Sequence, residues 1–339
     1  MEPFITEEDI KKYDVKDMKS VLEEFPEQVR ESWGKAERIQ LTEQPNCIVV
    51  GGMGGSAIAG DLLKSYINSE EKLKLPFVVC RQYHLPSFVN NKSLVFISSY
   101  SGNTEETISM YNDAVRKNAQ VVVITSGGKL KELAMKNQHT IIRVPQGIQP
   151  RNAVAYGFFP VLRILSNSGF INDKSKNVEH IIQLSRRPVV KEKAIELAEK
   201  ISHRVPLIYA SNILSAVAER WKTQFNENTK VHAFYNLFSE LDHNEIVGFT
   251  NPNADYYVIM LRDVGEDRRI VKRMELTKDL IKKYKVPVTE LGVSGDCLMT
   301  RMFTSILIGD WTSYFLAIYY RTDPTTVSVI EELKSKISS

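Results

Sequence analysis

The sequence predicts an α/β protein made of two similar halves, each a parallel sheet flanked by helices. Short apolar runs rich in β-branched residues alternate with helical patterns from Cys47 to about Val144, which is typical of a parallel sheet with helices on both faces. A second alternation of the same kind begins at Pro206. The 339 residues suffice for two such domains, and a hydrophobic content of 43% supports a sizeable core.

The first half is expected to span residues 1–166, with a helical segment before its sheet. Helical patterns separate most of its apolar runs, and residues 152–166 form a further helical pattern. This order implies parallel strand pairs joined by crossover helices. The buried strands are predicted at residues 47–50, 76–80, 94–98, 121–125 and 140–144.

The second half is expected to span residues 205–339, after a polar linker and a connecting helix at residues 167–204. Its first strand, at 206–211, ends in Ser211 and precedes a helix at 213–225. This repeats the start of the first half without its glycines. Further strands are predicted at 256–261 and 286–291, and further helices at 267–284, 297–320 and 326–337.

The composition excludes several classes of protein. The net charge is +3 and the basic residues are scattered, so we expect no nucleic-acid or membrane partner. Cys47, Cys80 and Cys297 lie far apart, and no cysteine–histidine cluster has the spacing of a metal site. No apolar run reaches the ~18 residues of a membrane span, and the acidic residues 1–9 contain no signal core. We expect a soluble cytoplasmic protein, because free thiols persist in that reducing compartment.

A glycine-rich turn follows the first predicted strand and opens a helix. It has the sequence Gly-Gly-Met-Gly-Gly-Ser, which makes Gly54, Gly55 and Ser56 candidates for binding a phosphate at a helix N-terminus. A dinucleotide site is an alternative, but the next strand ends in Arg81 and Gln82, where that site requires an acidic residue. A P-loop is excluded because its Gly-Lys-Ser/Thr is missing. A plain tight turn is the third interpretation.

A second turn, Ser-Tyr-Ser-Gly-Asn-Thr, follows the third predicted strand. The hydroxyl groups of Ser99, Ser101 and Thr104, and the absence of lysine, favour a sugar phosphate held by neutral donors. The alternative is that Ser101 and Thr104 only cap the following helix, whose acidic first turn suits the helix dipole. We expect the site in the cleft between the two halves.

The two turns together resemble the sugar isomerase (SIS) domain, and the remaining motifs resemble the bifunctional phosphoglucose/phosphomannose isomerase family. The resemblance implies two SIS-type subdomains, each a flavodoxin-like three-layer sandwich. The chain departs from the expected pattern at Asn152 and Thr326, where we expect a small apolar residue and proline. The remaining motifs are Pro150-Arg151, Asn226-Glu227-Asn228, Asp242-His243-Asn244-Glu245 and Asp323-Pro324-Thr325-Thr326-Val327.

The implied activity is the interconversion of glucose 6-phosphate, and mannose 6-phosphate, with fructose 6-phosphate through an enediolate. This chemistry needs a base beside the C1–C2 bond, a group that moves the ring-oxygen proton, and a positive charge for the enediolate. It requires no metal ion or redox cofactor, and none is expected. The resemblance assigns Glu227 as the base, His243 to ring opening, Arg151 and Lys334 as active-site cations, and Thr325 to the sugar.

The residues by themselves leave other interpretations open. Glu227 also fits a solvated helix end, and Arg151 and Lys334 fit ordinary surface cations. A non-catalytic sugar-phosphate sensor would need the two serine turns but neither Glu227 nor His243. An amidotransferase of the same fold would need a glutaminase domain with an N-terminal cysteine, whereas this chain begins Met1-Glu2.

The resemblance also implies a homodimer in which His243 reaches the active site of the neighbouring subunit. The aromatic-rich residues 234–238 precede this histidine and are of the kind enriched at interfaces. The alternative is that this run is buried core within one chain.

Overall fold

The computed structural model of the chain describes residues 4–41, 43–71, 73–293 and 295–338. The chain divides into an N-terminal unit, residues 24–184, and a C-terminal unit, residues 1–23 and 185–339. The first helices therefore belong to the C-terminal unit rather than to the predicted domain of residues 1–166. Tyr314 donates a hydrogen bond to Asp14 at 3.0 Å, and Met18 and Leu22 are buried, which anchors them there. Residues 1–3, with which the predicted first domain begins, lie outside the described residues.

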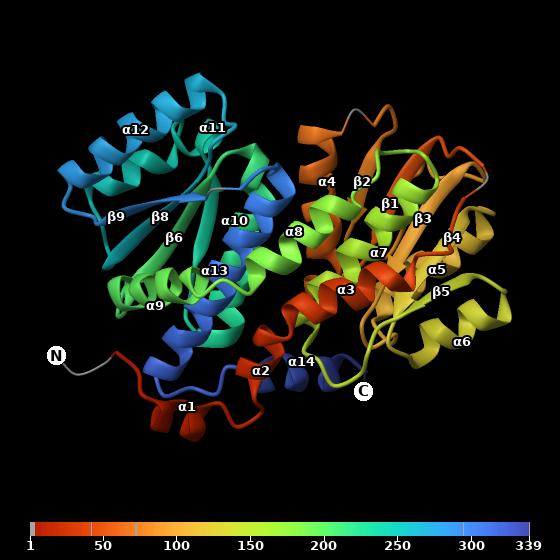
Figure 1. Ribbon diagram of the computed structural model, residues 1–339, viewed down its shortest axis with the longest axis horizontal. Coiled ribbons are helices and arrows are strands. Elements are labelled where there is room, and N and C mark those ends of the chain that lie inside the picture. The colour runs from red at the N-terminus through yellow and green to blue at the C-terminus, as the bar shows by residue number, and fades with distance from the viewer. Residues whose placement is uncertain (1–3, 42, 72, 294, 339) are drawn as a thin grey trace. The chain divides into compact units, whose positions relative to one another are not determined.

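The N-terminal unit contains a five-stranded sheet in the order β2-β1-β3-β4-β5, with all neighbours parallel (Figure 1). This is the flavodoxin-like order, in which the chain changes direction across the sheet between β1 and β3. The strands are β1 (Cys47–Gly51), β2 (Phe77–Cys80), β3 (Ser93–Ser98), β4 (Gln120–Thr125) and β5 (Thr140–Arg143). The helices are α3 (Phe25–Lys35), α4 (Gly54–Glu70), α5 (Glu105–Arg116), α6 (Gly128–Lys136), the 3-10 turn η1 (Pro150–Asn152), α7 (Val154–Asn167) and α8 (Ser175–Ser185), which ends at the unit boundary.

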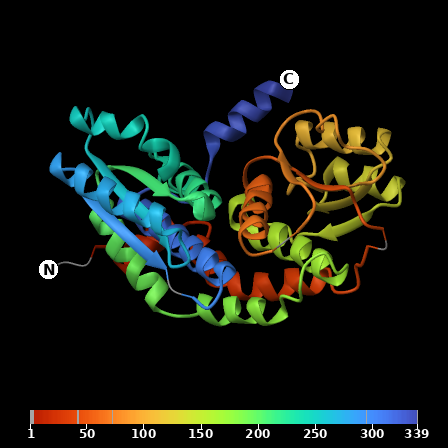
Figure 2. The same ribbon diagram turned by 90° about the horizontal axis from the view of Figure 1, so that it is seen from above.

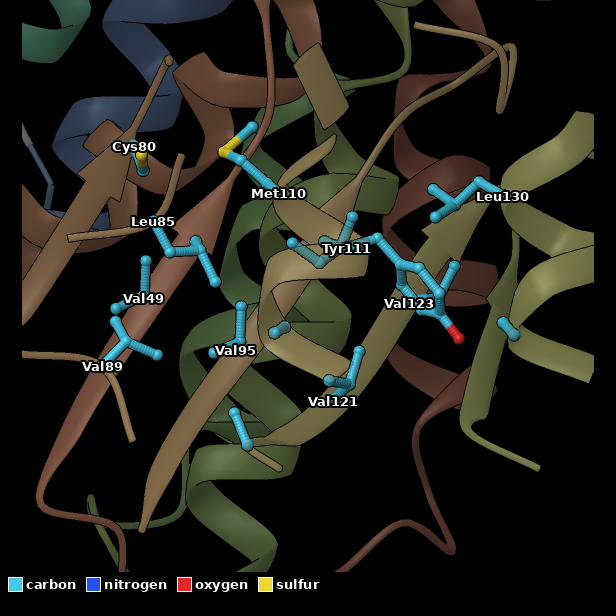
Figure 3. Close-up of a cluster of buried hydrophobic side chains, with 14 of the residues drawn as sticks. Val49, Cys80, Leu85, Val89, Val95, Met110, Tyr111, Val121, Val123 and Leu130 are labelled. Carbon is cyan, nitrogen blue, oxygen red and sulfur yellow. The ribbon is translucent and has the colours of Figure 1, made fainter. Parts of the chain in front are cut away.

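Helices cover both faces of this sheet. On one face, Val95 and Val123 pack against Met110 and Tyr111 of α5, with α6 beside them (Figure 3). On the other face lie α4 and α7, with α3 packed against α7 (Figure 1). Helices α4 and α7 cross so closely that a Cβ on Gly157 of α7 would lie 2.7 Å from Cβ of Ala59 of α4. The predicted three-layer arrangement is confirmed.

The C-terminal unit contains a four-stranded parallel sheet in the order β7-β6-β8-β9, which repeats the first four positions of the other sheet. Its strands are β6 (Val205–Ala210), β7 (Phe234–Leu237), β8 (Tyr256–Asp263) and β9 (Val288–Val293). Its α-helices are α1 (Glu7–Tyr13), α2 (Met18–Glu23), α9 (Val189–Ile201), α10 (Ser215–Gln224), α11 (Phe238–Leu241), α12 (Arg268–Lys283), α13 (Leu298–Tyr319) and α14 (Ser328–Ser338). The shorter turns are η2 (Asn212–Leu214), the π-helix η3 (Phe225–Thr229) and η4 (Glu245–Thr250).

The core of this unit is built around α13, whose 22 residues are buried along almost their whole length. Trp221 of α10 packs against Gly309, where an added Cβ would lie 2.4 Å from the indole ring. The buried Arg220 donates to Asp310 at 2.7 Å, so neither charge is left without a counter-charge. No helix within the described ranges is both long and apolar enough to cross a membrane.

Three predicted elements differ from the observed ones. The helical pattern before residue 203 is divided into α8 and α9 at Pro188, because proline cannot continue a helix. The helix predicted to end at residue 225 continues as η3, and the strand predicted at 286–291 begins after Pro287. The edge strand β7 was not predicted, since its Phe234 and Tyr235 are both exposed and show no alternation.

Candidate active site

Two serine-containing loops lie next to each other at the carboxyl ends of β1 and β3 in the N-terminal unit. Ser99 Oγ donates to Thr104 Oγ1 at 3.1 Å and accepts from the N–H of Gly102 at 3.2 Å, so the second loop closes on itself. The N–H of Tyr100 donates to Ser56 Oγ at 3.3 Å and links this loop to the first. The structure therefore brings together the predicted phosphate ligands Ser56, Ser99, Ser101 and Thr104.

The helices that begin at these loops have no side-chain cap. Their N-cap residues are Met53 for α4 and Thr104 for α5, and neither side chain bonds to a first-turn N–H group. Ser101 Oγ accepts instead from the N–H of Asn103 at 3.2 Å. An uncapped N-terminus presents backbone donors and the positive end of the helix dipole, as anion binding requires. Helix capping therefore does not account for Ser101 and Thr104.

Glycines are necessary where these loops approach other backbone segments. Gly102 has φ +70°, and a Cβ there would lie 1.8 Å from the carbonyl oxygen of Gly127. A Cβ on Gly55 would lie 2.8 Å from the carbonyl oxygen of Pro150. Gly54, with φ +49°, takes the left-handed conformation at the first residue of α4. These contacts place η1, which carries Arg151, against the start of α4.

A small pocket opens at this edge of the sheet. Arg151 is 3% exposed, which does not fit the surface-cation interpretation. Asn152, which departs from the expected family pattern, is also buried. The pocket is lined by Gly55, Ser56, Ser98, Tyr100, Ile124, Val144, Pro150, Ala153, Tyr156 and Gly157.

Tyr100 and Tyr156 line the pocket although sequence reasoning assigned them no role. The hydroxyl of Tyr100 donates to the carbonyl of Pro145 and accepts from the N–H of Ile148, each at 2.8 Å, and so holds the loop that leads to Arg151. Burial raises the pKa of the Tyr100 hydroxyl, which keeps it protonated.

Tyr156 donates to the carboxylate of Glu31, and burial followed by this hydrogen bond raises the pKa of the Tyr156 hydroxyl. Tyr100 stands inside the serine turn and could have been considered from the sequence. The pairing of Tyr156 with Glu31 joins residues 125 positions apart and has no local signal.

Glu227 lies in the C-terminal unit on η3, which continues α10 instead of ending it. Phe225 and Asn228 of η3 are fully buried, and Asn228 Nδ2 donates to Ser313 Oγ of α13 at 2.9 Å. Glu227 is half-buried. Single π-helical turns occur frequently at functional sites. The glutamate is therefore held on an anchored turn and not on a fraying helix end.

His243 is presented on a loop whose neighbouring residues are fixed. Asp242 accepts from Thr277 Oγ1 at 2.8 Å, and Glu245 accepts from Tyr209 at 2.6 Å and from Asn236. The His243 side chain is exposed, and it forms no hydrogen bond or ion pair with any residue that the structure describes. The contacts of Asp242 and Glu245 fix the loop on either side of His243, and neither ring nitrogen of His243 has a partner among the described residues.

Thr325 and Lys334 lie on the C-terminal segment of the chain. Thr325 is 5% exposed, and its N–H donates to Asp323 Oδ1 at 2.8 Å. Lys334 is on α14, which is exposed through residue 337 and projects from its unit (Figure 2). Glu227, His243, Thr325 and Lys334 therefore occupy four separate segments of this unit, whereas the phosphate candidates share one edge of a sheet. Within the described ranges, no three His, Cys, Asp or Glu residues form a group suited to a metal ion.

Known proteins similar to this chain identify its family. A family model described as the bacterial phospho-glucose isomerase C-terminal SIS domain matches residues 190–337. The chain is 40% identical to the bifunctional phosphoglucose/phosphomannose isomerase of Caldicellulosiruptor bescii, over 93% of this chain and 97% of the relative. It is 38% identical to the Thermoplasma acidophilum protein of the same name, over 86% and 89% of the two chains. The chain belongs to the bifunctional phosphoglucose/phosphomannose isomerase family.

A solved structure with low sequence identity shares the fold of this phosphoglucose/phosphomannose isomerase family member. The C-terminal domain of glucosamine-fructose-6-phosphate aminotransferase from Francisella tularensis superposes with a TM-score of 0.70 at 18% identity. The match covers 91% of this chain and 97% of that domain. The predicted family and the double SIS fold are both confirmed.

Proposed function

We propose that this protein is an aldose–ketose isomerase that converts glucose 6-phosphate and mannose 6-phosphate to fructose 6-phosphate. Family membership supports the reaction class, because the relatives carry both activities in their names. Within the chain, the strongest support is the pair of uncapped helix N-termini beside Ser56 and Ser99, which offer neutral donors to a phosphate.

We assign the proton transfers to two side chains of the C-terminal unit. Glu227 would move the proton between C2 and C1, and His243 would move the ring-oxygen proton. Arg151 and Lys334 would stabilise the negative charge of the enediolate, and Thr325 would contact the sugar. Ser56, Ser99, Ser101 and Thr104, with the backbone at Gly54 and Gly55, would bind the phosphate.

A coupled assay of fructose 6-phosphate formation tests this proposal with each aldose phosphate in turn. Formation of fructose 6-phosphate from both is the expected result. Binding of either sugar phosphate without turnover would contradict the proposal and support a non-catalytic sensor. Loss of activity on treatment with a chelator would contradict the metal-free chemistry.

We further propose a cytoplasmic homodimer in which His243 completes the site of the partner subunit. Free cysteines support the reducing compartment. The exposed Phe234 and Tyr235 on edge strand β7 support an interface, whereas Phe238 is buried core. The unpartnered imidazole of His243 also fits a role outside its own chain.

Mixed dimers test the composite site. Glu227→Gln and His243→Ala homodimers should each be nearly inactive, and refolding them together should place about half the chains in mixed dimers by random pairing. One site of each mixed dimer would collect both defects and the other none, so activity should return to about a quarter of wild type. Mixed dimers seen by mass spectrometry but no more active than their parents would contradict it.

A further inference from the structure

The π-helix that carries Glu227 is followed by a lysine with a left-handed backbone. Lys230 has φ +58° and ψ +24°. Glycine or asparagine is usual at such a position, because the left-handed region is strained for residues with a longer side chain. Lys230 therefore stands in a backbone conformation that its side chain does not favour, and the contacts of its ammonium distinguish it from other residues of this kind.

The ammonium of Lys230 binds three backbone carbonyls. Nζ donates to the carbonyl oxygens of Glu227 at 2.8 Å, Asn228 at 3.1 Å and Asp323 at 2.6 Å. Glu227 and Asn228 stand at the end of η3, where helix carbonyls lack intrahelical donors and a cation suits the dipole. Asp323 is 93 residues away in the sequence, and its carboxylate accepts the N–H of Thr325.

We infer that Lys230 is a positioning residue for catalysis, which ties the backbone of Glu227 to the segment that leads to Thr325 and Lys334. This inference rests on the proposed function, in which these residues act on the sugar. Asn228 already anchors η3 to Ser313 on α13, and Lys230 adds a second anchor on the side of the C-terminal segment. A general base must lie within hydrogen-bond reach of its proton, so a small displacement of η3 would slow proton transfer.

Lys285 provides a matched control for a purely structural role. It also has a left-handed backbone, with φ +62°, and follows helix α12 in the same unit. Its ammonium has no hydrogen-bond partner in the part of the chain that the structure describes. Replacing Lys285 therefore removes the same side chain from the same backbone conformation without breaking a link between segments.

The first test compares Lys230→Met with Lys285→Met. Methionine keeps an unbranched side chain that ends at the position of the lysine Cε, and it removes the ammonium. We expect kcat of Lys230→Met to fall about 30-fold, while KM and the Kd of an unreactive sugar 6-phosphate stay within about twofold, because misplacement affects the reacting groups and not the phosphate loops. Lys285→Met should keep wild-type kcat.

Chemical restoration of the ammonium provides the second test. The folded Lys230→Cys variant is alkylated with 2-bromoethylamine, which forms a carbon–sulfur bond, displaces bromide and yields a lysine-length ammonium. Iodoacetamide alkylation is the neutral control, and wild-type protein treated alike accounts for the native cysteines. We expect kcat to rise at least about tenfold with the ammonium and not with the amide.

The outcomes separate the inference from the function on which it rests. Wild-type kcat in Lys230→Met, an equal loss in Lys285→Met, or no difference between the two alkylations would each overturn the positioning role while leaving the isomerase intact. Turnover absent from wild type, or retained in Glu227→Gln, would overturn the proposed function together with the inference. If Lys230→Met does not fold, the alkylated cysteine variant decides between these outcomes.

Discussion

The two units place different side chains at the same position of the same fold. Their sheets share the strand order, so the loop between β3 and α5 corresponds to the loop between β8 and α12. The first loop carries hydroxyl groups, and α5 begins without a side-chain cap. In the second, Asp267 caps α12 by accepting the N–H of Arg269 at 2.8 Å. An anion would meet backbone donors in one unit and a carboxylate in the other.

A second contact closes the loop of the C-terminal unit. Asp263, at the end of β8, accepts from Arg301 Nε at 2.6 Å and from the N–H of Gly265 at 2.7 Å. Both members of this ion pair are buried, so the cation is already neutralised. The fold supplies a helix N-terminus at this position in each unit, and the local side chains determine whether it can receive a ligand.

The largest effect is expected for a variant that removes the base proposed in the C-terminal unit and leaves the proposed phosphate loops of the N-terminal unit unchanged. Glu227→Gln keeps the shape of the side chain and removes its basicity. Turnover should fall by about three orders of magnitude, the scale of a general base. Calorimetry with an unreactive sugar 6-phosphate should give nearly wild-type affinity. If this variant exchanged tritium between solvent and C2 at the wild-type rate, Glu227 would not be the general base.

The second largest effect is expected when only the loop proposed to bind the phosphate is disrupted. Gly102→Ala introduces a Cβ into a left-handed backbone and against the carbonyl of Gly127. It should lower the free energy of unfolding by at least about 2 kcal/mol and abolish binding of the sugar phosphate. Gly265→Ala is the matched change in the other loop, where the added Cβ would lie 3.0 Å from Asp263 Oδ1. Equal losses of affinity in both variants would show that the two loops do not differ as described.

Removal of one hydroxyl should have a smaller effect. Ser101→Ala would lose a hydrogen bond to a charged group, worth roughly 1.5–3 kcal/mol, which corresponds to roughly a 10- to 150-fold rise in Kd. The unfolding free energy should change little, because the Ser101 side chain is exposed. Unchanged affinity for the sugar 6-phosphate would show that Ser101 does not bind the phosphate and that its hydroxyl only accepts the N–H of Asn103.

The smallest effect is expected in the loop before α12, where Asp267 already caps the helix. Hydrogen bonds from the side chain and then the backbone of Arg269 lower the pKa of Asp267 to about 2. The folded pKa lies below the unfolded value, so the carboxylate stabilises α12 above about pH 4 and loses this effect as the pH falls toward about 2. Asp267→Ala should therefore lower the melting temperature slightly at neutral pH and leave kcat unchanged. A marked loss of kcat would assign this loop a role in the site.

The sequence predicted the elements whose signals are local. The β-branched runs at β1 and β3 and the two serine turns after them identified the sheet edge at which the phosphate candidates lie. The edge strand β7 escaped prediction because its aromatic residues face solvent without alternation. Contacts between residues far apart in the chain also could not be predicted, because they leave no local pattern in the sequence. The bond from Tyr314 to Asp14 spans 300 residues and places the first helices in the C-terminal unit, and that from Lys230 to Asp323 spans 93.

The stoichiometry of phosphate binding tests the difference between the units most directly. Isothermal titration of the wild-type protein with an unreactive sugar 6-phosphate should give one bound molecule per chain. Asp267→Ala should keep that value, and Gly102→Ala should bind none. Two molecules per chain in the wild type, or binding that survives Gly102→Ala, would contradict the account in which only the N-terminal unit holds the phosphate.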